Sequence, residues 1–129
     1  MSKAHALVID DNGRSVKVLL MLLAKEDVSY SEVGHPSQLE SVLETLDAVD
    51  VVFLDLEMPN RDGFEVRDVL RADSRFDGIP IIAYTVHVSE IDRTYEQGFD
   101  GFIGKPLDSD RFPEQLERIL NGEAVWETA

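Results

Sequence analysis

Two apolar patterns alternate along this chain. Short runs with the character of strands lie near residues 6–10, 29–33, 50–55, 79–85 and 101–105. Strands buried in a parallel sheet are nearly continuous in apolar residues, whereas a helix that covers a sheet repeats them every three to four positions. The segments between and after the runs have the helical spacing. The pattern predicts an α/β fold of five strand–helix units with one parallel sheet.

The predicted helices differ in the strength of their patterns. The second has a clear stripe that includes Leu39 and Leu43, and it follows a capping box formed by Ser37 and Glu40. The fourth, within residues 89–98, has few large apolar residues to bury. We therefore expect the fourth helix to be the element that shifts most readily.

Chemically active side chains stand where the predicted strands end. Asp10 and Asp11 close the first run, Asp55 the third, Thr85 the fourth and Lys105 the fifth. Taken singly, each has an ordinary explanation, such as a helix cap or a turn. The carboxyl ends of parallel strands, however, open onto one crevice of the sheet. Three acids, a hydroxyl and an ammonium at one edge predict a site for a divalent cation and a phosphoryl group.

Composition narrows the class of protein. There is no cysteine, which excludes a disulfide framework and a thiolate metal site. The 12 basic and 26 acidic residues give a net charge of −14, which repels nucleic acids and anionic membranes. No signal peptide or apolar run of membrane length is visible. We expect a cytoplasmic protein that binds neither nucleic acid nor membrane.

The domain organisation is predicted to be simple. Residues 1–122 are expected to form one domain, and residues 123–129 a short tail, EAVWETA. This tail is too short to form an effector domain. Its Trp126 either folds back as a cap or is disordered. The output of such a protein is expected to be binding to other proteins.

Four motifs occur in order over nearly the whole chain: VIDDN, DLEMPNRDGFEV, YT and KP. Together they resemble the receiver domain of two-component response regulators. The resemblance implies a flavodoxin-like (βα)5 fold, a doubly wound parallel sheet with strand order 2-1-3-4-5. It also implies a stand-alone response regulator. Such a protein is a phosphoacceptor switch that catalyses its own phosphorylation and dephosphorylation, and is not otherwise an enzyme.

The resemblance implies a Mg²⁺ site at the strand ends. Asp11 would ligate the ion directly, and Asp10 would act mainly through water. Asp55 and the backbone carbonyl of Glu57 would complete the protein ligands. Physical chemistry supports this set, because a hard cation with oxygen ligands relieves the repulsion among clustered carboxylates.

The resemblance also implies how the switch works. Asp55 would accept a phosphoryl group from the phosphohistidine of a histidine kinase or a histidine phosphotransfer protein. Lys105 would pair with that group and Thr85 would hydrogen-bond to it. Phe102, where tyrosine is common in the family, would then change rotamer. The surface of the fourth helix, fifth strand and fifth helix would change and control a downstream protein target.

Three residues are predicted to tune the lifetime of the phosphoryl group. The residue after the switch hydroxyl is usually small in the family, but this chain has Val86, followed by His87. Their bulk would hinder a hydrolytic water or a phosphatase, and Glu57 is the third candidate. The resemblance further implies that the bond between Lys105 and Pro106 is cis.

The first helix, within VKVLLMLLA, has more apolar residues than one buried stripe needs. One register buries Val16, Leu19, Leu20 and Leu23. The other buries Val18, Leu19, Leu22 and Leu23. The resemblance favours the second, which leaves Val16 and Leu20 outside as scattered apolar residues or as a partner face. That face would bind the kinase or mediate self-association, so a monomer and a phosphorylation-dependent homodimer both stay open.

Three other functions remain open at this point. A phosphatase of the haloacid dehalogenase type also uses a strand-end aspartate, but it needs a second one two residues later, where Glu57 stands. An FMN-binding flavodoxin needs hydroxyls and amides where this chain has DDNGRS. A degenerate receiver would serve only as a docking module, although the strand-end residues expected of an active receiver are all present.

Overall fold

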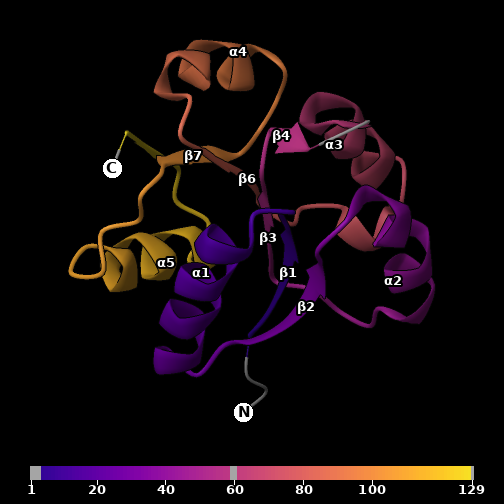
Figure 1. Cartoon of the computed structure of the whole chain (residues 1–129), viewed down its shortest axis with the longest axis horizontal. Helices are drawn as coiled ribbons and strands as arrows, with labels where there is room; N and C mark the ends of the chain where they lie inside the picture. The colour runs from indigo at the N-terminus through magenta and orange to yellow at the C-terminus, as the bar shows by residue number, and fades with distance from the viewer. Residues whose placement is uncertain (1–3, 59–60, 129) are drawn as a thin grey trace.

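The computed structural model describes residues 4–58 and 61–128, which form an α/β fold around a central parallel sheet (Figure 1). The strands in spatial order are β2 (Ser29–Val33), β1 (His5–Ile9), β3 (Val51–Leu54), β6 (Ile81–Thr85), β7 (Gly101–Gly104) and β8 (Val125–Glu127). The first five are the predicted strands in the predicted order, so the flavodoxin-like fold is confirmed. Strand β8 is an addition that the apolar pattern does not predict.

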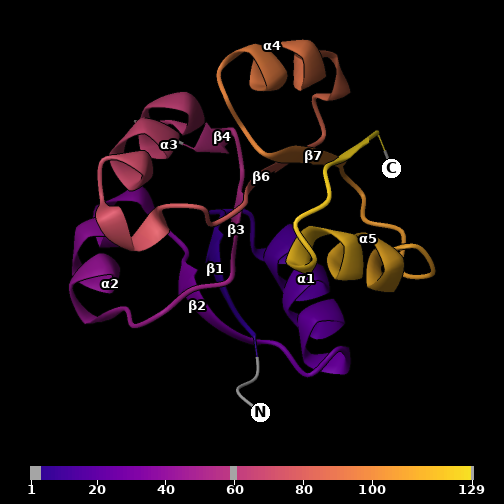
Figure 2. The ribbon, with the colours of Figure 1, turned by 180° about the vertical axis from the view of Figure 1, so that it is seen from behind.

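In the described part of the chain, five α-helices pack around this sheet: α1 (Gly13–Lys25), α2 (Leu39–Thr45), α3 (Gly63–Arg71), α4 (Ile91–Glu96) and α5 (Phe112–Leu120). Helices α1 and α5 lie on one face, and α2 and α3 lie on the other, as the front and back views show (Figures 1 and 2). Within residues 4–58 and 61–128, no helix is long and apolar enough to cross a membrane.

Each face of the sheet has its own apolar cluster, because successive residues of a strand point to opposite sides. On β1, Ala6 and Val8 belong to the cluster beneath α1 and α5, whereas Leu7 and Ile9 belong to the cluster beneath α2 and α3. All four are fully buried. The strands are therefore held on both faces, and the loops at their carboxyl ends are positioned by a fixed scaffold.

Two helices begin next to the acidic edge of the sheet, and each has a side-chain cap. The Asn12 side chain accepts hydrogen bonds from the backbone N–H groups of Arg14 and Ser15 at the start of α1. The Asp62 carboxylate accepts one from Phe64 at the start of α3. Gly63 is required there, because a Cβ atom would lie 2.7 Å from the Cα of Leu56. These caps fix the loops after β1 and β3.

Both predicted registers of the first helix are wrong. The buried residues of α1 are Val16, Leu19, Leu22 and Leu23, and Leu20 is partly buried beside them. Val18 is 40% exposed. The reason is that α1 packs against both the sheet and α5, which together cover a wider stripe than a sheet alone would.

The predicted capping box of α2 is also wrong. Residues 36–38 form a turn of 3₁₀ helix, so that α2 begins only at Leu39. The Ser37 hydroxyl lies 2.8 Å from the ring of His35 instead of bonding to the first turn of α2. Helix α4 is short, as its sequence suggests, and Thr94 is its buried residue.

Candidate functional site

The three strand-end acids meet at the carboxyl edge of the sheet. Strands β1 and β3 pair Ile9 with Leu54, so the residues that follow, Asp10 and Asp55, lie at the same level. With Asp11, they offer carboxylate oxygens that all lie within 4.8 Å of one another. Asp10 and Asp55 are buried and Asp11 is exposed. Two carboxyl groups thus lie inside the fold, with a third at its surface.

Lys105 extends into this cluster from the end of β7. Its Nζ atom lies 2.9 Å from Oδ2 of Asp10 and 3.5 Å from Oδ2 of Asp55. The lysine side chain is only 7% exposed, so both ion pairs are largely shielded from water. The peptide bond between Lys105 and Pro106 is cis, as predicted.

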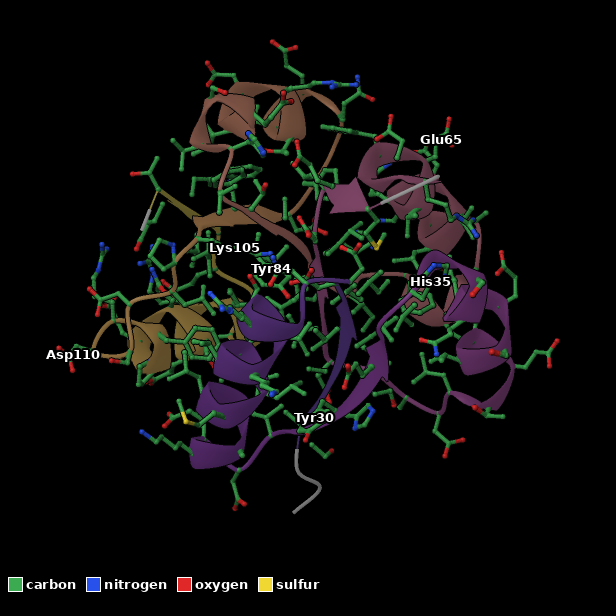
Figure 3. All side chains as sticks on the ribbon, viewed as in Figure 1. Tyr30, His35, Glu65, Tyr84, Lys105 and Asp110 are labelled. Atoms are coloured by element: carbon green, nitrogen blue, oxygen red, sulfur yellow. The ribbon has the colours of Figure 1, made fainter. Side chains whose placement is uncertain are left out.

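Tyr84 is a site residue that the sequence analysis missed. It is fully buried in β6, and its hydroxyl donates a 2.5 Å hydrogen bond to Oδ2 of Asp10. The Lys105 ammonium lies 4.4 Å from the centre of its ring, and the two side chains are labelled next to each other in Figure 3. Burial, with the nearby Asp10 carboxylate, raises the pKa of Tyr84, so the hydroxyl keeps the proton that it donates. A signal was present, because a tyrosine inside a buried strand needs a polar partner.

The carboxyl group of Asp55 is strongly perturbed. Burial raises its pKa to about 7, and the adjacent Asp10 carboxylate adds to the rise, which the charge of Lys105 opposes. The backbone N–H of Glu57 donates a 3.2 Å hydrogen bond to Oδ1 of Asp55, which favours the ionised form. A neighbouring cation would lower the proton affinity of this group.

The residues at this edge fit a Mg²⁺ ion. The three carboxylates supply only oxygen ligands, and they carry more negative charge than Lys105 can balance. Mg²⁺ prefers oxygen ligands and is usually held by one or two carboxylates, with the remaining positions left to water or phosphate. Asp10, Asp11 and Asp55 would hold it, with the Glu57 carbonyl as a predicted further ligand.

The two predicted switch residues lie on neighbouring strands, where Thr85 stands two positions beyond Ala83, the residue that pairs with Phe102. Thr85 ends β6, is 1% exposed, and its Oγ1 atom accepts a 3.2 Å hydrogen bond from the backbone N–H of His87. Phe102 on the neighbouring strand β7 is fully buried in the cluster beneath α2 and α3. In this structure the phenylalanine ring is therefore in an inward position.

The predicted tuning residues form one side of the entrance to the site. Nε2 of His87 lies 2.8 Å from the Glu57 carboxylate, so the two side chains bridge the loops after β3 and β6. Together with Thr85 they line a pocket of about 230 Å³. Val86 is 60% exposed beside this bridge. An exposed contact between His87 and Glu57 thus stands next to the position where a phosphoryl group would lie.

The predicted partner face needs a correction. Val16 is buried against the sheet, so it cannot contribute to a surface, and Leu20 packs partly into the same cluster. These two side chains are fully or partly buried because α1 packs against both the sheet and α5, so that a wide stripe of the helix is covered. The exposed apolar residues of α1 are Val18 and Met21. Val18 and Leu107 line a pocket of about 180 Å³ that extends to Tyr84 and Lys105.

Comparison with known proteins assigns the family. The response regulator receiver domain model matches residues 6–117. The chain belongs to this family. It is therefore a receiver domain of two-component signalling, and the phosphatase and flavodoxin alternatives are no longer needed.

Relatives of the receiver come from several kinds of signalling protein. The hybrid signal transduction protein dokA of Dictyostelium discoideum is 33% identical over 117 residues, which are 88% of this chain and 7% of that protein. The DNA-binding response regulator MtrA of Mycolicibacterium paratuberculosis is 34% identical over 107 residues, which are 81% of this chain and 46% of that protein. The chain thus spans less than half the length of these curated relatives.

Solved structures share the fold of the receiver. The chemotaxis response regulator CheY4 of Vibrio cholerae has a TM-score of 0.80 at 21% identity, over 92% of this chain and 99% of that chain. The receiver domain of a sensor histidine kinase from Pseudomonas aeruginosa, solved with a coordinated magnesium ion, has a TM-score of 0.80 at 22% identity. The match covers 93% of this chain and 99% of that chain.

Proposed function

We propose that this receiver is a phosphorylation switch in which Asp55 accepts a phosphoryl group from the phosphohistidine of a kinase or phosphotransfer protein. The arrangement of Asp55 and Lys105 carries this proposal. The acceptor carboxylate lies 3.5 Å from a shielded ammonium, inside a cluster of three acids that suits Mg²⁺. A site that served only for docking would have no need to bury these charges together.

The chemistry is a single displacement at phosphorus. An Asp55 carboxylate oxygen forms the new bond, the bond from phosphorus to the histidine nitrogen breaks, and the imidazole leaves with its electron pair. Lys105 balances negative charge on the transferring group, and Asp10 and Tyr84 hold the lysine in place. When bound, Mg²⁺ neutralises part of the charge on the phosphoryl oxygens.

The signal would pass from the acceptor to the surface through Thr85 and Phe102. A phosphoryl group on Asp55 adds negative charge and acceptor oxygens near Thr85. Movement of Thr85 toward it would disturb the loop before α4, the helix that buries Thr94 alone among its residues. The expected output is a change in the surface of α4, β7 and α5 that a downstream protein recognises.

The net charge and the family indicate which partners this protein binds and where it acts. A net charge of −14 supports a protein target in place of direct binding to nucleic acid, although one relative, MtrA, is named as DNA-binding. Histidine kinases act on such receivers in the cytoplasm, and we place this protein there. Its self-association, if any, would depend on phosphorylation.

The proposal is tested by intact mass after incubation with acetyl phosphate and Mg²⁺. We expect the mass of one phosphoryl group to be added, and EDTA to prevent the addition. An unchanged mass after long incubation, with the fold intact by circular dichroism, would mean that the receiver is a docking module.

Loss of the bridge at the entrance should shorten the life of the phosphoryl group. We expect His87→Ala and Val86→Ala each to speed dephosphorylation about two- to fivefold, because each removes side-chain bulk from the path of an attacking water; this is a change of about 0.4–1 kcal/mol in the barrier. Decay of the phosphorylated mass after removal of the donor measures the rate. The matched control is His35→Ala, which removes an exposed histidine that bonds only locally to Ser37. A lifetime equal to that of the control would remove these residues from the tuning role.

A further inference from the structure

Strand β8 lies along the edge of β7 and contacts Tyr95 of α4 on one side and Gln115 and Arg118 of α5 on the other. The surface that it covers between these helices is called the groove. It pairs in parallel with β7, with Val125 opposite Gly101 and Trp126 opposite Phe102. Both views show the yellow end of the chain beside β7 (Figures 1 and 2). The outer edge of the predicted five-stranded sheet is thus covered by a segment of three residues.

The groove is shaped to accept a backbone. A Cβ atom on Gly101 would lie 2.7 Å from the carbonyl oxygen of Val125. One on Gly104 would lie 2.0 Å from the carbonyl oxygen of Thr128. Any side chain at either position would push the added strand away. These two glycines therefore allow a sixth strand to come close to β7.

Side chains of β8 alternate between the two walls of the groove. Val125 is fully buried on the α5 side. Trp126 faces α4, where its ring meets Tyr95 edge to face with 5.2 Å between the ring centres. Glu127 returns to the α5 side. The groove thus recognises an apolar residue, an aromatic residue and a carboxylate in succession.

The carboxylate is the most specific of these three features. Glu127 accepts hydrogen bonds of 2.8 Å from Nε2 of Gln115 and 2.8 Å from Nη1 of Arg118, and it also pairs with Arg111. The bond from Gln115, with the two arginines, lowers the pKa of Glu127, so the group is ionised at neutral pH. A strongly acidic protein thus presents two cations on the α5 wall.

The occupant of the groove, β8, is a short segment that can leave without unfolding the core. Strand β8 follows α5 through Gly122, which has a φ of +84°, and it has three residues. The α4 wall is itself lightly held, since Tyr95 is 69% exposed. A short segment at the edge of a sheet opens at a lower free energy than the central strands do. If β8 left, β7 would become an edge strand with unpaired backbone groups next to two arginines.

We propose that this groove is a strand-binding site for a partner protein, and that β8 is its internal competitor. The partner would present an extended segment with an apolar residue, an aromatic residue and a carboxylate in successive positions. Strand addition gives affinity through backbone hydrogen bonds, and the walls give specificity through alternate side chains. The inference does not require phosphorylation of Asp55.

The test uses a fluorescein-labelled peptide of residues 121–128 and the full chain, with binding followed by anisotropy. Wild-type protein should bind the peptide weakly, because its own strand competes. Glu127→Gln and Trp126→Ala loosen β8 and should each bind the peptide at least about tenfold more tightly. A peptide with glutamine in place of its second glutamate should bind at least about fivefold more weakly, because hydrogen bonds to a charged group are the stronger ones.

Two controls separate this groove from other surfaces. Glu123→Gln changes an exposed acid next to β8 and should bind the peptide as wild type does. Gly104→Ala blocks the groove and should abolish binding, with the fold checked by circular dichroism. Trp126 is the one tryptophan of the chain, so an unlabelled peptide with tyrosine in its place should shift the emission of the wild type to the red.

Several outcomes would overturn the proposal. One is that neither Glu127→Gln nor Trp126→Ala, both folded, binds the peptide more tightly than the wild type does. Another is that the glutamine peptide binds as tightly as the original peptide. A third is that Gly104→Ala binds the peptide as the wild type does. Light scattering provides a further arm. If the wild type formed a dimer at higher concentration and Glu127→Gln did not, two copies would be exchanging their β8 strands. The occupant of the groove would then be a second copy of this chain and not a partner protein.

Discussion

Asp55→Asn should abolish phosphoryl uptake while leaving the fold intact. The amide keeps the shape of the carboxylate but is a poor nucleophile, so we expect the rate to fall at least roughly a thousandfold, as it does when other enzymes lose a nucleophile. Intact mass at timed intervals with acetyl phosphate and Mg²⁺ measures this rate. Asp55 is 5% exposed and an asparagine of the same size fills its place, so circular dichroism should be unchanged.

Asp47→Asn is the matched control, because it makes the same chemical change at an exposed position of the loop after α2. It should take up phosphoryl at the wild-type rate. Uptake by the Asp55 variant at that same rate would show that the acceptor is another carboxylate, and peptide mapping of the phosphorylated chain would identify it.

The second large effect concerns stability in the absence of Mg²⁺. The folded-state pKa of Asp55 is about 7, against 3.8 for the ordinary group, so the folded protein binds this proton more tightly than the unfolded chain does. The contribution of Asp55 to the free energy of unfolding is therefore fully present below the unfolded-state pKa of 3.8, and it is lost as the pH rises through the folded-state pKa of about 7. We expect the free energy of unfolding to fall by about 2 kcal/mol between pH 5.5 and 7.5 from this source.

Urea denaturation in EDTA at several pH values measures this effect, and Asp55→Asn isolates it. The variant should lack that fall, because its amide does not titrate, while the three histidines are common to both proteins. Adding Mg²⁺ to the wild type should restore stability at pH 7.5, since the cation favours the ionised carboxylate. An equal dependence on pH in both proteins would mean that Asp55 is ionised throughout this range.

The position of the candidate site could be predicted because strand ends in a parallel sheet have a simple geometry. Asp10, Asp55, Thr85 and Lys105 each follow a short apolar run, and the runs themselves define the strands. Parallel strands bring their carboxyl ends to one edge whatever the details of packing. The acidic cluster and the proximity of Lys105 therefore follow from order along the chain.

Features that depend on a second element could not be predicted in this way. The register of α1 was misjudged because a helical stripe shows which residues are apolar but not how wide a surface covers them. Tyr84 looked like one more apolar residue of β6, although its hydroxyl holds Asp10. Its partner lies 74 positions away, and no local pattern relates two residues so distant.

The sequence by itself determined the fold class and the edge at which the charged residues gather, because these depend on periodicity and on the ends of strands. The strand order was implied by the resemblance to receiver domains. The tertiary structure alone decided what covers the far edge of the sheet. VWE is too short to be recognised as a strand from the sequence. It becomes a strand only because Gly101 and Gly104 leave room for its backbone and Glu127 pairs with Arg111 and Arg118. A strand of three residues is stabilised mainly by contacts with neighbouring strands and helices, and the fold decides which elements these are.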